Sequence, residues 1–144
     1  MKIPTRVGIL FAFASFLIVS CATYYQKNLV FQQHFANGEI EEASKALEKN
    51  KKAKENRNRL LYFLQKGVVS QMIGDFEGSN SFFEEAYIFG QDYKKSYSME
   101  LASILTNPML KPYTGEDHEM VLLHYYKVLN FLRLGQMDAA LVEC

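Results

Sequence analysis

The chain is 144 residues long, which leaves room for one modest domain once an amino-terminal signal is set aside. Hydrophobic residues make up 49% of the chain and charged residues 22%, so it can bury a core and is not compositionally disordered. Sixteen basic residues balance sixteen acidic ones, which argues against the strong positive field of a nucleic-acid-binding protein. We therefore expect no nucleic acid partner.

The first twenty residues have the pattern of a secretion signal. Lys2 and Arg6 form a positively charged start, and residues 7–19 are then almost continuously apolar. These thirteen residues are fewer than the roughly 20 that a helix needs to span a bilayer. The pattern favours a cleaved signal, residues 1–20, over a permanent transmembrane anchor.

Residues 18–21 fit a lipobox: an aliphatic residue, a tolerant position, a small residue and Cys21. The Cys21 thiolate would receive a diacylglyceryl group, and two acyl chains anchor stably where one binds only marginally. We expect residues 21–144 to be tethered in this way to the bacterial cell envelope. Ala22 is not the aspartate that resembles an inner-membrane retention signal, so the outer membrane is the expected destination. With Cys21 modified, Cys144 would have no disulfide partner.

The rest of the sequence predicts an all-α fold. Apolar residues recur at spacings of three and four, as in Leu60, Leu64 and Val68. Three glycines, Gly38, Gly74 and Gly135, each follow an apolar helical run, where a left-handed helix cap costs glycine nothing. Each glycine is expected to mark the turn into a second helix.

Aligning the three glycines reveals an internal repeat. Apolar residues lie two positions after each glycine, small residues lie five positions after, and large apolar residues lie nine positions after the first two. The positions expected to pack where two helices cross are Ala43, Gly67, Ser79, Phe83, Ala86 and Ala140.

This pattern resembles the tetratricopeptide repeat, and residues 60–87 match it best. The two outer units are degenerate, and no unit has the usual closing proline. Gly38 and Gly74 are 36 residues apart, close to the roughly 34 of that family. The resemblance implies a short superhelix of antiparallel helical hairpins over residues 21–144.

An insertion of about one helix and a loop is expected between the second and third units, at approximately residues 90–115. Tyr97, Leu101 and Ile104 would give that helix one apolar face, and Pro108 would end it. Thr114 and Asp117 are predicted to form a capping box that begins the next helix.

Residues 114–119 are the most concentrated polar cluster and contain Glu116, Asp117 and His118. Acids at a helix amino terminus interact favourably with the helix dipole, so a structural interpretation is favoured over a metal or acid–base site. His34 and His124 are expected to be packed or partly exposed residues of the repeat. No catalytic residue, metal ligand or cofactor is assigned from the sequence.

A basic stretch, residues 45–59, holds seven basic residues against two acidic ones. It could contact anionic headgroups or peptidoglycan, although a solvated turn between repeats is the favoured interpretation.

Beyond the general repeat, residues 107–143 resemble an uncharacterised family of bacterial repeat-containing lipoproteins. The likeness is carried by Asn107, Pro108, Tyr113, Gly115, Glu116, Asp117, Glu119, the stretch LLHYYKVLNFLRLG over 122–135 and ALVE over 140–143 with Ala139 before it. The resemblance implies a superhelical fold and an envelope location but brings no activity. Because members of that family continue further, we expect a chain truncated at its carboxyl end.

The leading hypothesis is a non-enzymatic, lipid-anchored scaffold whose hairpins bind a protein or an extended peptide. One alternative is an envelope metal-dependent hydrolase that uses Glu116, Asp117 and His118. Another is a structural cell-wall attachment protein that binds through the basic stretch near Lys51 and Lys52.

Overall fold

The computed structural model of the chain describes residues 26, 28–95 and 112–144. The signal peptide, Cys21 and the helix expected around Leu101 and Ile104 lie outside the described residues. Six α-helices and one short 3-10 helix occupy the described part: α3 (Leu29–Ala36), α4 (Ile40–Lys49), η1 (Asn56–Asn58), α5 (Arg59–Met72), α6 (Phe76–Lys95), α8 (Asp117–Arg133) and α9 (Met137–Val142). No strand occurs in these residues, and the all-helical class is confirmed for them.

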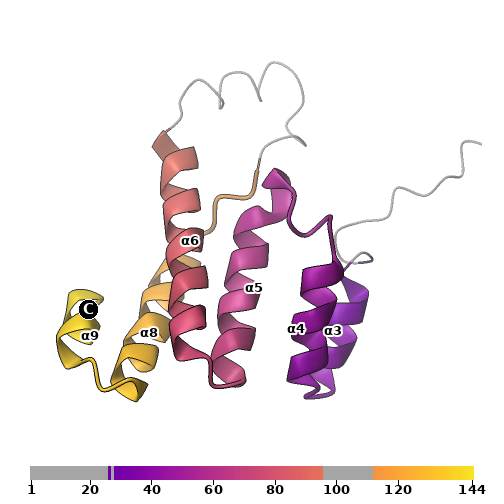
Figure 1. Cartoon of the computed structure of the whole chain (residues 1–144). Coiled ribbons are helices and arrows are strands. Elements are labelled where there is room, and N and C mark those ends of the chain that lie inside the picture. Colours follow the sequence, from indigo (N-terminus) through magenta and orange to yellow (C-terminus); the bar gives the residue numbers. More distant parts are fainter. Residues whose placement is uncertain (1–25, 27, 96–111) are drawn as a thin grey trace, which may run out of the picture.

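The helices pair into three hairpins that follow one another in chain order (Figure 1). The pairs are α3 with α4, α5 with α6, and α8 with α9. Neighbouring hairpins touch through α4 and α5 and through α6 and α8, with a smaller contact between α5 and α8. The three turns within the hairpins all lie at the same edge of the molecule (Figure 1).

Each hairpin turns through the same hydrogen-bonded motif. Gly38, Gly74 and Gly135 have φ angles of +76°, +87° and +72°, which L side chains rarely adopt. After each glycine, the next backbone N–H returns to a carbonyl in the last turn of the first helix, as in Glu39 to His34 at 2.9 Å and Asp75 to Ser70 at 2.9 Å. The second helix begins two residues after each glycine.

Two hydrophobic clusters form the core, and α5 contributes to both. The first cluster contains Phe31, Ala43, Leu47 and Val69. The second contains Phe83, Ala86 and Leu123, with Phe63, Leu64 and Val68 of α5 packed against it. The central helix α5 therefore joins the first hairpin to the rest of the molecule.

Helices α5 and α6 cross closely at Gly67. A Cβ atom at Gly67 would lie 2.6 Å from the Phe83 ring, which is itself buried. The Ser79 hydroxyl donates a hydrogen bond of 2.7 Å to the Gly67 carbonyl across the same contact. Gly67, which has no side chain, and Ser79, which has a short one, thus let the backbones of α5 and α6 approach each other.

The predicted capping box at Thr114 and Asp117 is wrong by two residues. Helix α8 begins at Asp117 with Glu116 as its N-cap, and the Glu119 carboxylate accepts the Glu116 N–H at 2.9 Å. Gly115 has a φ of +82°, so the chain turns between Thr114 and the helix. That turn moves the helix start beyond the reach of the Thr114 hydroxyl.

Candidate functional site

The repeat positions singled out from the sequence are buried at the helix crossings. Ala43, Ser79 and Ala140, each five residues after its glycine, are at most 3% exposed. Phe83 and Ala86 belong to the second cluster, and Gly67 faces Phe83. These residues set how closely the helices approach, and none of them lines the depression at Met72 and Ile73 or the one at Leu61 and Tyr113.

Buried lysines connect neighbouring hairpins. Lys66 of α5 donates to the Glu48 carboxylate at 2.7 Å and to the Ser44 hydroxyl at 2.9 Å, both on α4. The Lys66 side chain is 7% exposed, whereas Glu48 is about half exposed. The hydrogen bond from Lys66 lowers the pKa of the Glu48 carboxylate below its usual value.

Lys127 of α8 makes the corresponding contact to α6. Its Nζ atom lies 2.7 Å from Glu84 and 2.5 Å from Glu143, which follows α9. Burial alone would lower the pKa of Lys127, but its bonds to Glu143 and Glu84 outweigh burial and raise that pKa. The Glu143 carboxylate also contacts His124 at 2.7 Å, and the Tyr87 ring lies edge-on to that histidine.

Both lysines occupy one repeat position, which the sequence analysis missed. Lys66 and Lys127 lie eight residues before their glycines, and Glu48 and Glu84 lie ten residues after the preceding glycines. The signal was therefore present as a matched spacing between units. It was overlooked because isolated lysines are usually solvent-exposed.

An amide network adds to the contact between the second and third hairpins. Asn130 of α8 is fully buried, and its amide nitrogen donates to Ser79 at 2.8 Å and to Asn80 at 2.9 Å. Its amide oxygen accepts from Gln71 at 2.8 Å. The Asn130 amide, bonded at both its nitrogen and its oxygen, fixes the register of the third hairpin on the second.

An open depression of about 450 Å³ lies where the turns of the first two hairpins meet. Met72 and Ile73, at the end of α5, are about half exposed in it. They precede Gly74 directly, so the turn holds them at the edge of the molecule rather than in the core. The other lining residues are Gly38, Glu39, Ile40, Glu41 and Glu42.

The rim of this turn depression is acidic. Glu39 contacts the His34 ring at 2.5 Å, and Glu42 contacts Lys45 at 2.7 Å. The hydrogen bond from Lys45 lowers the pKa of the Glu42 carboxylate below its usual value. Exposed apolar side chains beside carboxylates can contact an apolar side chain that has a cation next to it.

The acidic cluster around His118 lies at the start of α8. Glu116, Asp117 and His118 are exposed at the start of α8, while Glu119 turns back to accept the Tyr113 hydroxyl. Burial and this hydrogen bond raise the pKa of Tyr113 to about 12. In the part of the chain that the structure describes, no three His, Cys, Asp or Glu side chains gather as metal ligands.

The basic stretch covers the second half of α4, the connection that follows it and the first residue of α5. Lys51 and Lys52 are exposed, and Lys52 pairs with Glu55 at 2.7 Å. The Lys54 ammonium lies 5.5 Å from the centre of the Tyr62 ring. The lysines of the stretch thus make local ion pairs and one cation–π contact, while Ala53 within it is buried.

The described residues thus form an all-helical protein of serial hairpins with an acidic turn depression. No protein-family model, curated protein or solved structure matches this chain. Among the helices of the described ranges, none combines the length and apolar character needed to cross a membrane.

Proposed function

We propose that this chain is a lipid-anchored scaffold of the bacterial envelope, in which TPR-like hairpins present a binding surface for another protein. The anchor is the lipidated Cys21 that the amino-terminal pattern predicts, and the outer membrane is its proposed location. The observation that carries the binding role is the turn depression, where Met72 and Ile73 stand half exposed beside three glutamates.

The chemistry of the depression defines the partner. Burying a large apolar side chain contributes about 1.5–3 kcal/mol, so Met72 and Ile73 favour a partner with an apolar residue at the contact. Glu39 and Glu42 already contact His34 and Lys45, so the exposed carboxylate of Glu41 is the rim charge that favours a positively charged residue beside it. We therefore propose a protein segment that carries an apolar side chain flanked by lysine or arginine.

The anchor is tested by the substitution Cys21→Ser in the full chain. Without the thiol no diacylglyceryl group can attach, so the variant is expected to escape lipoprotein processing and to leave the membrane fraction. Immunoblots of separated membrane and soluble fractions measure this. Normal processing and full membrane partition of the variant would contradict the proposed anchor.

The binding surface is tested by replacing Ile73 with a photoreactive amino acid in the full chain, in cells that produce this variant. Irradiation is expected to link position 73 to an envelope protein, and mass spectrometry of the linked peptide should find a basic residue next to an apolar one. The same probe at Ile88, which is similarly exposed on α6 outside the depression, serves as the control.

Charge reversal sharpens this test. Glu41→Lys is expected to reduce the yield of crosslinked product from position 73 several-fold, because an exposed ion pair at the rim contributes up to about 1 kcal/mol to binding. Glu77→Lys is the matched control, since Glu77 is also exposed and lies at the same repeat position of the next hairpin. Equal losses from both variants, or equal capture at positions 73 and 88, would count against the turn depression.

A further inference from the structure

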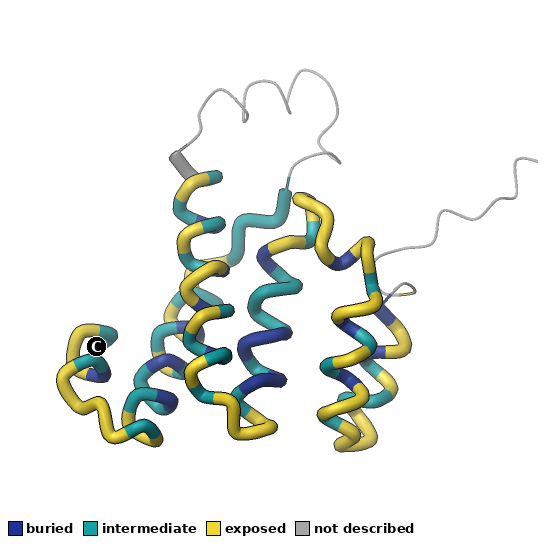
Figure 2. The backbone as a smooth tube through the Cα atoms, viewed as in Figure 1, coloured by how far each residue is buried: buried dark blue, intermediate teal, exposed yellow. Residues whose placement is uncertain are grey.

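The exposed charges of the first two hairpins are unevenly distributed. Residues 49–59 carry six exposed basic side chains against one exposed carboxylate, that of Glu55. The six, which we call the basic edge, are Lys49, Lys51, Lys52, Lys54, Arg57 and Arg59. They lie on the connection from α4 to α5 and at the helix ends beside it, where most of the chain is exposed (Figure 2).

The opposite end of the same helices carries the opposite charge. Because α4 ends and α5 begins away from the hairpin turns, the basic edge lies at the other end of these helices from the turn depression (Figure 1). The exposed carboxylates near the turns are Glu39, Glu41, Glu42, Asp75 and Glu77. Helix α5 has 14 residues, which separates the two ends by about 21 Å. A charged surface at one end therefore has little effect on the other, because the Debye length at physiological ionic strength is only about 8 Å.

Contacts within the chain neutralise the basic edge only in part. Lys52 pairs with Glu55 at 2.7 Å, and the Lys54 ammonium lies over the Tyr62 ring. Lys51, Arg57 and Arg59 form no ion pair with any of the described residues. These exposed cations are available to an anionic surface outside the chain.

The chain approaches the first hairpin from Cys21 at the end where α4 finishes. Asn28, the residue before α3, is seven residues after Cys21. Seven residues span at most roughly 25 Å, so a lipid on Cys21 would hold the start of α3 within that distance of the bilayer. This tether alone does not decide which end of the hairpins faces the bilayer, because α3 has 8 residues and is only about 12 Å long. The distribution of charge does decide it.

We propose that the basic edge lies against the anionic phospholipid headgroups of the bilayer that holds the Cys21 lipid, with the turn depression facing away from the membrane. This inference rests on the proposed anchor. Clustered lysines and arginines beside a membrane attachment bind anionic lipids, and the attachment raises their effective concentration at the headgroups. Glu116 and Asp117 are exposed at the start of α8, so the contact is confined to the first two hairpins.

The test uses the lipid-bearing full chain, purified from membranes and placed in vesicles of phosphatidylcholine and phosphatidylglycerol. Cys144→Ser removes the exposed free thiol, and the Cys21 thiol carries the lipid. A fluorescent label is then attached at Asn56→Cys, beside the basic edge, or at Asn37→Cys, in the first turn; both asparagines are exposed. A nitroxide on the lipid headgroups is expected to quench the label at position 56 several-fold more than at position 37.

Two comparisons test whether charge causes the difference. In vesicles of phosphatidylcholine alone, the difference between positions 56 and 37 is expected to shrink several-fold, because the anchor remains while the negative headgroups are gone. Lys51→Gln combined with Arg57→Gln is expected to do the same in the mixed vesicles. Lys45→Gln combined with Arg133→Gln removes equal charge from exposed residues outside the basic edge and should leave the difference unchanged. Circular dichroism checks the fold of each variant.

Equal quenching at the two positions would overturn this orientation, as would a difference that neutral vesicles or the Lys51 and Arg57 variant leave unchanged. Flotation of the vesicles reports the anchor separately. A chain that floats but shows equal quenching overturns the orientation alone, whereas a chain that does not float overturns the anchor and the orientation together. If quenching is equal and the chain in detergent sediments with purified peptidoglycan through Lys51 and Arg57, the basic edge binds the cell wall instead.

Discussion

Gly67 and Gly74 lie one after the other along the second hairpin, yet different physical constraints require glycine at each. Gly67 sits inside α5, where an added Cβ would lie 2.6 Å from the buried Phe83 ring. Gly74 has open space around it but a φ of +87°, which strains L side chains. At Gly67 there is no room for a side chain, whereas at Gly74 there is room but the backbone conformation strains any L residue.

These constraints predict opposite rankings of alanine and asparagine. At Gly67 the larger side chain is worse: Gly67→Ala is expected to cost about 1–3 kcal/mol through overpacking, and Gly67→Asn more. At Gly74 alanine is expected to cost about 1–2 kcal/mol, and Gly74→Asn less, because asparagine tolerates left-handed backbone. Free energies of unfolding from urea titrations of the four variants measure this, and one common ranking at both positions would contradict it.

The residues that organise the backbone were predictable from the sequence, whereas the residues that pair across hairpins were not. Gly38, Gly74 and Gly135 stand out because glycine after an apolar helical run has few other uses. Lys66 and Lys127 do not stand out, because their burial depends on Glu48 and Glu84 from another helix. Met72 and Ile73 resemble core residues in sequence, and only the turn position shows that they are half exposed.

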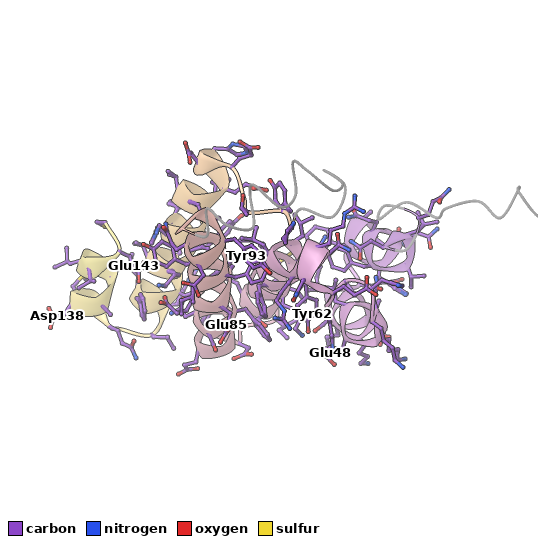
Figure 3. All side chains as sticks on the ribbon, turned by 90° about the horizontal axis from the view of Figure 1, so that it is seen from above. Glu48, Tyr62, Glu85, Tyr93, Asp138 and Glu143 are labelled. Atoms are coloured by element: carbon purple, nitrogen blue, oxygen red, sulfur yellow. The ribbon has the colours of Figure 1, made fainter. Side chains whose placement is uncertain are left out.

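Helix α9 depends on a single carboxylate more than the longer helices do. It has six residues, too few for a helix to be stable alone, and Ala140 is its one buried residue. Glu143 directly follows it and binds both Lys127 and His124 of α8. Viewed from above, Glu143 lies between α9 and α8, while Asp138 lies on the outer side of α9 (Figure 3).

The pKa of Glu143 gives this link a defined pH dependence. Burial would raise that pKa, but the bonds from Lys127 and His124 prevail and hold it below the usual 4.5. A carboxylate whose folded pKa is depressed stabilises the fold fully above its unfolded pKa and loses that effect as pH falls through the folded value. Docking of α9 should therefore weaken in acid, below about pH 4.5.

We expect Glu143→Gln to cost about 1–3 kcal/mol at pH 7, because it removes a carboxylate that is 12% exposed from a buried lysine. The difference from the parent chain should narrow as the pH falls from 5 to 3, since the parent then loses the same charge. Urea unfolding at a series of pH values measures it. Asp138→Asn, on the outer side of α9, is the control and should change stability by less than about 1 kcal/mol. A Glu143→Gln effect that does not vary with pH would contradict this role.

The arrangement of whole hairpins could be expected in part from the sequence. Periodicity and three glycines indicate helical pairs, and the all-helical class follows from them. The start of α8 was misplaced because Gly115 takes a positive φ that a capping pattern does not reveal. Which hairpins touch, and through which side chains, depends on tertiary contacts such as those of Asn130, which no local pattern encodes.

In the molecule as a whole, helix α5 contributes to both hydrophobic clusters. Its adjacent residues Val68 and Val69 pack against different clusters. Val69 packs in the cluster of the first hairpin, and Val68 packs against the cluster that includes Leu123 of α8. The stability of serial hairpins is the sum of the stability of each hairpin and of its contacts with its neighbours. Removing one valine should therefore destabilise mainly the hairpin that this valine contacts.

Val69→Ala is expected to increase amide hydrogen exchange in α3 and α4, and Val68→Ala in α8. Each loses buried methyl contacts, at a cost of about 1–3 kcal/mol, with the larger loss at Val69 because it is fully buried. Hydrogen exchange followed by mass spectrometry resolves the segments, and each variant is the matched control for the other. If both variants loosened the same helices equally, the chain would unfold as one unit, and α5 would not separate two independently stabilised neighbours.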